Sequence, residues 1–242
     1  MNPALCNELA KIAPMHVSDL PERTQDYLKV LWDYEERHGE GTPMALGELA
    51  TALQQKLPTA SEAVKRLAKQ KLVVHERYFG VGLTPTGREL AVVMARRHRL
   101  LETFLVRTLG YSWDEVHAEA DALEHATSDR FVDAIDAHLG HPVRDPHGDP
   151  IPRADGSSEP LSPQRLAQAE PGAEVILEQV NDSDPELLRY LDRFAVHPGS
   201  ALRVVAAPMA GLLEVETSTG ATFTVAEGVA QEMVVRPPDK DS

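Results

Sequence analysis

The first 84 residues show three helical periods of apolar side chains followed by two short extended runs. Apolar residues recur every three to four positions in segments that open near Pro21, near Leu46 and at Pro58, and a short polar turn joins the second segment to the third. Two short helices with a tight turn between them are typical of a helix-turn-helix. Residues 72–84 then read as a strand, a glycine-containing turn and a strand. The pattern predicts a winged helix-turn-helix DNA-binding domain over residues 1–84.

The middle of the chain is predicted to be helical. A long helix begins at Pro85 and runs to about Leu109, and a third helix of this region covers residues 128–139. Between them, the Ser-x-x-Glu pattern of residues 112–115 has the form of a capping box that opens another helix. These helices carry more apolar positions than one small domain needs, so residues 85–140 are predicted to form the interface of a homodimer.

The rest of the chain changes in character. Residues 141–165 are rich in Pro, Gly, Asp and Ser, which is typical of a linker with turns. Residues 166–237 hold five short β-type runs, at a spacing that suggests a small barrel. The expected fold class is therefore mainly α with a small β domain.

Composition narrows the class of protein. The chain has 242 residues with 42% apolar content, which is ordinary for a globular protein, and no run reaches the ~18 apolar residues of a membrane-spanning helix. The single cysteine, Cys6, allows no intrachain disulfide. We expect a cytoplasmic protein with no membrane partner.

Charge is distributed unevenly along the chain. The formal net charge is -14, yet residues 56–107 hold 11 basic and 4 acidic residues, a local charge of +7. Residues 108–242 hold 9 basic and 25 acidic residues, a charge of -16. A local basic segment within an acidic protein is compatible either with a nucleic-acid surface or with a solvated basic face.

Candidate metal ligands gather on two of the predicted helices. His117, Asp121, Glu124 and His125 are spaced so that they share one helical face, and His98 and Glu102 form an i, i+4 pair on the preceding helix. Nitrogen and carboxylate donors of this kind suit Mn, Fe or Zn, and the lack of a cysteine among them argues against a thiolate site.

Two other interpretations of these residues stay open at this point. The face could be a solvated polar surface with chance histidines. The cluster could also belong to a di-metal hydrolase that activates water. Such an enzyme needs a substrate cleft and an acid or base outside the ligand set, and the sequence indicates neither, so we expect a regulator rather than an enzyme.

Five runs of the chain resemble the diphtheria toxin repressor family of metal-dependent regulators. They are DYL (26–28), LTPTG (83–87), RHRLLE (97–102), VHAEADALEH (116–125) and GDPIP (148–152). The resemblance implies a winged helix, a helical dimerisation domain and a C-terminal SH3-like domain. It also implies a homodimer that binds a palindromic operator on double-stranded DNA when loaded with Fe(II) or Mn(II).

The resemblance implies a primary metal site formed by five residues, namely Asp26, His98, Asp121, Glu124 and His125. Iron sensors of the family carry Met and Cys where this chain has Asp26 and Asp121. Hard carboxylate oxygens favour Mn(II) over Fe(II) and Co(II), so the pattern resembles the manganese-sensing branch, which represses manganese uptake genes. The alternatives are an iron-responsive repressor of the same family and, among the ions, Fe(II), Co(II) or Zn(II).

A second, ancillary site is implied as well. His98, Glu102 and His117 match the corresponding residues of the iron sensors, and the nearest acidic candidates from the SH3-like domain are Asp184 and Glu186. One residue departs from the manganese branch. Lys29 stands where that branch can carry a Glu that binds a second metal, which puts a binuclear site of that kind in doubt.

For DNA, the resemblance points to the helix that begins at Pro58. The candidate contacts are Thr59, Ser61, Glu62, Lys65 and Arg66 on this helix, with Arg77 and Tyr78 on the wing. Thr59 and Ser61 have an alternative role as helix N-caps.

Overall fold

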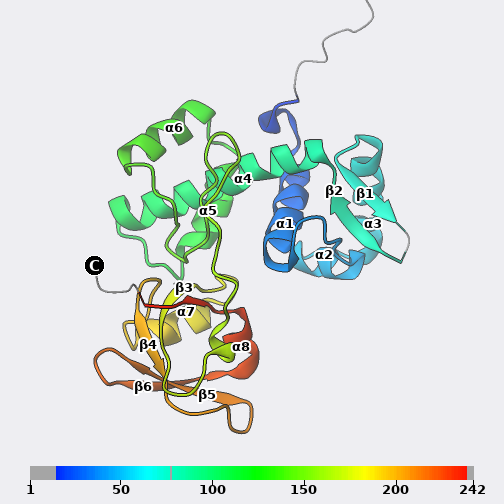
Figure 1. Cartoon of the computed structure of the whole chain (residues 1–242). Helices are drawn as coiled ribbons and strands as arrows, with labels where there is room; N and C mark the ends of the chain where they lie inside the picture. Colours follow the sequence, from blue (N-terminus) through cyan, green and yellow to red (C-terminus); the bar gives the residue numbers. More distant parts are fainter. Residues whose placement is uncertain (1–14, 77, 239–242) are drawn as a thin grey trace, which may run out of the picture. The chain divides into compact units, whose positions relative to one another are not determined.

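The computed structural model describes residues 15–76 and 78–238. Contacts within the chain divide it into two compact units, which adjoin in the sequence at Ala95 and Arg96. Figure 1 labels most of the helices and strands of both units. The division falls inside one long helix, α4 (Pro85–Phe104), rather than at the expected domain boundary after residue 84.

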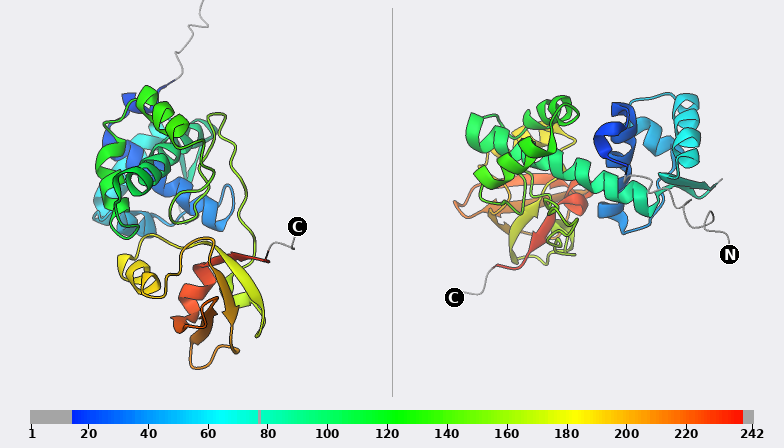
Figure 2. Two further views of the ribbon diagram at one scale, coloured as in Figure 1. Left: turned by 90° about the vertical axis from the view of Figure 1, so that its left-hand side faces the viewer. Right: turned by 90° about the horizontal axis from the view of Figure 1, so that it is seen from above.

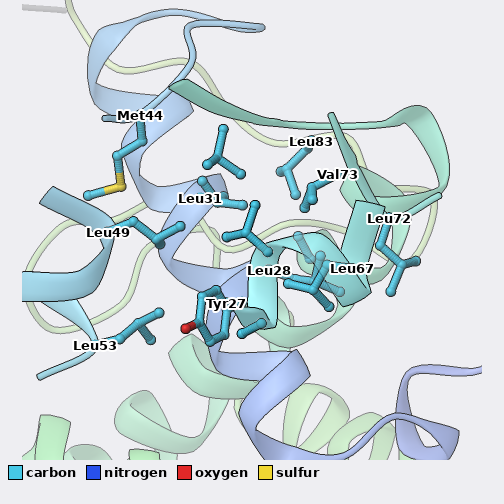
Figure 3. Packing of buried hydrophobic residues seen from close by; sticks show 14 of the residues in the cluster. Tyr27, Leu28, Leu31, Met44, Leu49, Leu53, Leu67, Leu72, Val73 and Leu83 are labelled. Carbon is cyan, nitrogen blue, oxygen red and sulfur yellow. The ribbon is translucent and has the colours of Figure 1, made fainter. Parts of the chain in front are cut away.

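The first unit is the predicted winged helix-turn-helix. A short 3-10 turn, η2 (Val17–Asp19), precedes three helices, a two-stranded antiparallel sheet and the start of α4. The elements are α1 (Glu22–His38), α2 (Leu46–Ala52), α3 (Leu57–Lys69), β1 (Val73–Glu76) and β2 (Gly80–Leu83). The apolar positions that predicted the helices meet in one core, where Tyr27 and Leu28 of α1 lie near Leu67 of α3 (Figure 3).

Two close approaches of the backbone hold this sheet and the start of α4 in place. Met44 and Val81 exchange backbone hydrogen bonds of 2.9 and 2.8 Å, so Met44 pairs with β2. Thr84 Oγ1 accepts the N–H of Gly87 at 3.0 Å and donates to the carbonyl of Lys71 at 2.7 Å. A Cβ on Gly87 would lie 1.9 Å from the carbonyl oxygen of Leu72, so only glycine fits there.

The helices of the second unit follow the predicted order with two differences. After α4, a π-helical turn, η3 (Leu105–Leu109), precedes α5 (Val116–Glu124) and α6 (Asp129–His138). Ser128 caps α6 as a side-chain acceptor, whereas α5 begins only at Val116. The predicted capping box is wrong because the Ser112 hydroxyl donates to the carboxylate of Glu115 at 3.0 Å instead of accepting a helical N–H.

The predicted β runs form a single antiparallel sheet with strand order β6-β5-β4-β3-β7. The strands are β3 (Glu174–Gln179), β4 (Ala201–Val204), β5 (Leu212–Thr217), β6 (Thr222–Ala226) and β7 (Val234–Arg236). Buried and exposed side chains alternate along β4, β5 and β6, as expected for a sheet with one covered face. This small β domain confirms the predicted fold class.

Two short helices of the β domain were not predicted. They are α7 (Pro185–Asp192) and α8 (Glu227–Glu232), and a 3-10 turn, η4 (Leu166–Gln168), precedes the first strand. Figure 2 shows α8 in red beside the orange strands β5 and β6, which it contacts. Residues 141–165 also differ from a solvated linker, since Asp145, His147 and Ile151 are all buried.

Candidate metal centre and DNA-binding surface

The side chain of His98 on α4 is the centre of the candidate metal site. Its Nδ1 lies 2.6 Å from Glu124 Oε2 and 3.4 Å from Asp121 Oδ1, both on α5. His98 and Glu124 are buried, while Asp121 is exposed. One donor atom from each of the three residues lies within 4.8 Å of the others, which is the arrangement that a shared cation requires.

A second group lies on the other side of the same imidazole. His98 Nε2 is 3.0 Å from Glu102 Oε1, and His117 Nδ1 is 3.2 Å from the same oxygen. The β domain completes the group, because Asp182 Oδ2 lies 2.8 Å from His117 Nδ1. The structure thus brings together the predicted ancillary residues His98, Glu102 and His117.

The acidic residue of the β domain in this group is Asp182, which corrects the candidates Asp184 and Glu186. The carboxylate of Asp184 caps α7, where it accepts the N–H of Glu186 at 3.0 Å and that of Leu187 at 3.2 Å. Asp184 and Glu186 line a shallow pocket together with Tyr190 of α7. The sequence does hold the signal, since Asp followed by Pro185 is a common start of a helix.

A third group contains a histidine that sequence reasoning missed. His147 is fully buried, its Nδ1 lies 3.7 Å from Glu102 Oε2, and Asp145 belongs to the same group of possible ligands. His147 Nε2 lies 2.6 Å from the backbone carbonyl of Trp113. The ring of Trp113 has two imidazole neighbours, with centroid distances of 6.0 Å to His147 and 4.6 Å to His197.

The hydrogen bonding of the buried atoms in this third group indicates whether a cation fits there. Neither His147 Nδ1 nor Glu102 Oε2 has a hydrogen-bond partner in the part of the chain that the structure describes. Buried polar atoms without partners are costly, and a divalent ion would satisfy both. The donors of all three groups are nitrogen and carboxylate oxygen, so the residues fit a hard or borderline divalent metal.

The electrostatics of these groups are set by imidazoles beside carboxylates. Burial raises the pKa of Glu102, but the charge of His98 and a hydrogen bond from His117 outweigh it and hold this pKa well below its usual range. Burial lowers the pKa of His117, yet Asp182 and Glu102 raise it to about 11. Burial likewise opposes the charged form of His147, and Glu102 and Asp145 raise its pKa to about 10. These protons have to leave before the nitrogens can bind a cation.

Two further predicted primary ligands are described here, each within its own unit. His125 is the C-cap of α5, and its Nε2 lies 3.8 Å from Glu124 Oε1. Asp26 belongs to the first unit, on α1, where its Oδ2 lies 3.3 Å from Arg23 Nη1. Both remain candidate ligands on the strength of the sequence pattern.

Helix α3 presents most of the predicted DNA contacts to solvent. Thr59, Glu62, Lys65 and Arg66 are exposed and Ser61 is half-buried, with Lys65 Nζ 2.6 Å from Glu62 Oε1. The N-cap of α3 is Lys56, without a side-chain capping bond, so Thr59 and Ser61 do not cap this helix. Tyr78 on the wing is exposed as well, and Arg77 lies outside the described residues.

Some of the basic residues between positions 56 and 107 are buried or paired and cannot contact DNA. The local charge of +7 counted from the sequence therefore overestimates the charge that this segment presents to DNA. Arg97 and Arg99 are buried, with Arg97 in an ion pair of 2.6 Å with Asp129 and Arg99 donating to the carbonyl of Pro150 at 2.6 Å. Arg96 is mostly buried and pairs with Asp136, and Arg88 pairs with Glu35 and Glu40. The exposed cations of α3 and the turn after it remain, and they are Lys56, Lys65, Arg66, Lys69 and Lys71.

Membrane insertion finds no support in the described residues, where no helix combines the length and the apolar character needed to cross a bilayer.

Comparison with protein families gives a match to three successive models. "Iron dependent repressor, N-terminal DNA binding domain" matches residues 19–81, and "Iron dependent repressor, metal binding and dimerisation domain" matches residues 84–153. The "FeoA domain" model matches residues 164–237.

Two characterised relatives are repressors named for iron or for diphtheria toxin. The chain is 31% identical over 210 residues to the iron-dependent repressor IdeR of Mycobacterium leprae, an alignment that covers 81% of this chain and 90% of that protein. It is 36% identical over 139 residues to the diphtheria toxin repressor of Corynebacterium diphtheriae, covering 57% of this chain and 60% of that protein.

Two similar solved structures are named for manganese. A manganese-dependent transcriptional repressor in complex with manganese is 44% identical, with a TM-score of 0.82 and coverage of 89% of this chain and 100% of that one. The manganese regulator SloR is 31% identical, with a TM-score of 0.75 and coverage of 89% and 98%.

Proposed function

Because the chain belongs to the diphtheria toxin repressor family of metal-dependent, DNA-binding transcriptional repressors, we propose that its effector is Mn(II) and its target a palindromic operator. The relatives are repressors rather than enzymes, so the hydrolase interpretation is set aside. We further propose that the metal-loaded homodimer represses genes of manganese uptake.

The choice of Mn(II) is carried by one observation, the hard donor set around His98. Asp121 lies 3.4 Å from His98 Nδ1, at a position where an iron sensor would have sulfur. Carboxylate oxygen is the donor that Mn(II) prefers, whereas sulfur favours the softer ions. The similarity to manganese-dependent repressors supports this choice. The curated relatives named for iron support the alternative, an iron-responsive repressor with the same fold.

We propose that the primary ion is held by His98, Asp121, Glu124, His125 and Asp26. The geometry around His98 supports the contributions of Asp121 and Glu124, and the sequence resemblance supports those of His125 and Asp26. A bound divalent ion would supply positive charge among carboxylates that otherwise repel one another. Because Asp26 stands on α1 of the DNA-binding unit, its use as a ligand would link metal occupancy to the state of that unit.

We propose that a second ion is held by Glu102, His117 and Asp182, with His147 and Asp145 as further donors. The buried atoms Glu102 Oε2 and His147 Nδ1 lie 3.7 Å apart and make no hydrogen bond to the described residues, which supports this assignment. Asp182 supplies a ligand from the β domain, so occupancy of this site would also stabilise the packing of the β domain on the helices.

The experiment that tests the function measures binding to DNA as a function of the metal. An operator is selected from a random duplex pool with the Mn(II)-loaded protein, and its affinity is measured by fluorescence anisotropy with Mn(II), Fe(II), Co(II), Zn(II) or a chelator at fixed ionic strength. We expect tight binding with Mn(II) and weak binding with the chelator. A well-folded dimer that binds no duplex more tightly with Mn(II) than with the chelator contradicts the proposal.

The choice of metal is tested separately with the double variant Asp26→Met, Asp121→Cys. Replacing two hard ligands with sulfur should shift the response from Mn(II) toward Fe(II) or Co(II). The single variant Asp121→Glu, which keeps an oxygen donor, serves as the control and should keep the preference for Mn(II). An unaltered preference in the double variant would contradict the assignment of these two ligands.

A further inference from the structure

A buried hydroxyl group on α1 contacts the turn of the helix-turn-helix. Tyr27 is 2% exposed and packs in the apolar core of the first unit, so its hydroxyl needs a hydrogen-bond partner inside the protein. That partner is Gln55, whose Oε1 accepts the hydroxyl at 2.8 Å. In Figure 3 the hydroxyl of Tyr27 points toward Leu53, the C-cap of α2. The contact therefore links α1 to the segment between α2 and α3.

The turn that carries Gln55 has a fixed shape. The N–H of Gln55 donates to the carbonyl of Ala50 at 2.8 Å, and Gln54 has a left-handed φ of 51°. A residue other than glycine adopts this φ at a cost in free energy, so the surrounding contacts must hold the turn in place. Helix α3 begins at Leu57, two residues after Gln55. The position of Gln55 therefore determines where α3 begins.

Tyr27 directly follows Asp26, a proposed metal ligand. Successive residues of an α-helix are rotated by about 100°, so Asp26 lies half-buried at the edge of α1 while Tyr27 faces the core. The backbone hydrogen bonds of the helix keep these two residues in a fixed relation to each other. A metal ion that binds Asp26 therefore also fixes the position of the Tyr27 ring.

The contacts of α1 with the helix-turn-helix differ in how sharply they fix its position. Leu28 of α1 and Leu67 of α3 belong to one apolar core, in which the attraction depends on buried area and has no direction. A hydrogen bond depends on both distance and angle, and it is lost when the donor and acceptor move apart by about 1 Å. The bond between Tyr27 and Gln55 therefore holds the turn before α3 at one position relative to α1.

We propose that Tyr27 is a positioning residue through which a metal ion bound at Asp26 sets the placement of α3. The inference rests on the proposed function, because it takes Asp26 as a metal ligand and duplex DNA as the partner of α3. When the ion fixes Asp26, the rigid helix α1 and the hydrogen bond to Gln55 fix the start of α3 as well. Without the bond, the ion fixes α1 but leaves the turn before α3 free to shift, so less of the metal's effect reaches DNA.

The test measures operator affinity with Mn(II) and with a chelator for Tyr27→Phe, which removes only the hydroxyl. Tyr34→Phe, the same change elsewhere on α1, is the matched control. Melting curves verify that each variant is folded, and titration with Mn(II) in the absence of DNA gives its metal affinity. We expect Tyr27→Phe to lower the ratio of the two operator affinities about 5-fold, by weakening only the binding with Mn(II). Its metal affinity without DNA should stay unchanged, and Tyr34→Phe should keep the ratio of the wild type.

A second variant, Gln55→Met, removes the acceptor at the other end of the bond. It should lower the ratio by a similar factor. The double variant Tyr27→Phe, Gln55→Met should lower the ratio no further than either single variant, because both changes break one interaction.

Three outcomes overturn the inference and leave the proposed function intact. Tyr27→Phe keeps the ratio of a wild type that itself responds to Mn(II), which shows that the hydroxyl transmits nothing. Tyr27→Phe weakens operator binding equally with Mn(II) and with the chelator, which reduces the hydroxyl to a structural role. The losses of the two single variants add in the double variant, which shows that they do not share one bond. If the wild type itself does not respond to Mn(II), the proposed function fails and this inference fails with it.

Discussion

Two aspartates only two residues apart, Asp182 and Asp184, have different roles in the β domain. Asp182 contacts His117 at 2.8 Å, whereas Asp184 accepts two backbone N–H groups at the start of α7. The carboxylate of Asp182 is therefore free of the helix backbone and can bind a metal ion, whereas the carboxylate of Asp184 caps the helix. Their spacing does not separate them, whereas Pro185 directly after Asp184 marks Asp184 as the helix cap.

Substituting each aspartate by alanine separates these roles. Asp182→Ala should lower the affinity for the second ion by about 10-fold or more, because it removes a donor of the cluster. Asp184→Ala should leave metal binding unchanged and lower the free energy of unfolding by about 1 kcal/mol, because it removes a cap. Isothermal titration with Mn(II) and chemical denaturation measure the two effects. Equal loss of metal affinity in both variants would contradict the assignment of Asp182.

The residues of the metal site differ in how far the sequence could identify them. His98, Glu102 and His117 were predictable, because helical periodicity places them on helix faces that can converge. His147 was not, because its sequence context, Asp-Pro-His-Gly, is typical of an exposed turn. Its burial depends on Trp113 and Glu102, which are distant in sequence.

At the scale of elements, the basic segment shows why a count of charges along the sequence overestimates the positive charge of the surface that the segment forms. Arg96, Arg97 and Arg99 follow one another on α4 and were counted with the cations of α3. Their partners are Asp129, Asp136 and the carbonyls of residues 150 and 152, all later in the chain. An ion pair between distant elements cannot be recognised from local composition, so the count included charges that DNA does not meet.

The salt dependence of DNA binding distinguishes the cations of α3 from the rest of the basic segment. Lys65→Ala should make the slope of log affinity against log salt shallower by about 0.9, since the exposed Lys65 lies on α3, the helix that we propose contacts DNA. Arg107→Ala is the matched control, because Arg107 is also exposed but lies on η3 in the second unit. Anisotropy titrations at several salt concentrations give both slopes. A change for Arg107→Ala as large as that for Lys65→Ala would contradict the restriction of the DNA surface to the first unit.

Most helices and strands were predictable, and the two short helices of the β domain were not. Helices α1, α3 and α4 have enough turns for their apolar period to stand out, and the strands carry β-branched runs bounded by turns. Helix α8 has six residues and α7 has eight, which gives a weak helical period, although Asp184 marks the start of α7. Helix α2 has only seven residues, but the turn and the helix that follow it identified it as part of a helix-turn-helix.

At the scale of the whole molecule, metal and DNA are two ligands of one protein. If Mn(II) raises the affinity for the operator by some factor, the operator must raise the affinity for Mn(II) by the same factor. Competition with a fluorescent chelator measures Mn(II) affinity with the operator, with a random duplex and without DNA. The operator should tighten Mn(II) binding by the factor seen in the DNA titrations, and the random duplex by much less. If the operator tightens Mn(II) binding no more than the random duplex does, the metal site and the DNA surface are not linked.

The order of the domains could be predicted because three patterns of apolar residues follow one another along the chain. They are short helical periods that end in a hairpin, longer helical periods, and short β-type runs. The burial of residues 145–151 could not, because Pro and Gly are equally typical of exposed and of packed irregular segments. In this protein that segment supplies His147 and Asp145 and receives the side chain of Arg99, so it belongs to the site rather than to a spacer.

The stacking of Trp113 against His147 has a spectroscopic consequence. The chain contains two tryptophans, and the other, Trp32, lies on α1 of the first unit. Emission from an indole responds to the charge and polarity of its neighbours, and a cation bound at His147 would replace a proton beside the Trp113 ring. With Trp32→Phe, Trp113 becomes the sole tryptophan of the chain, which can be excited apart from the tyrosines. Its quantum yield would then report filling of the second cluster in real time and without a label, independently of any event on DNA.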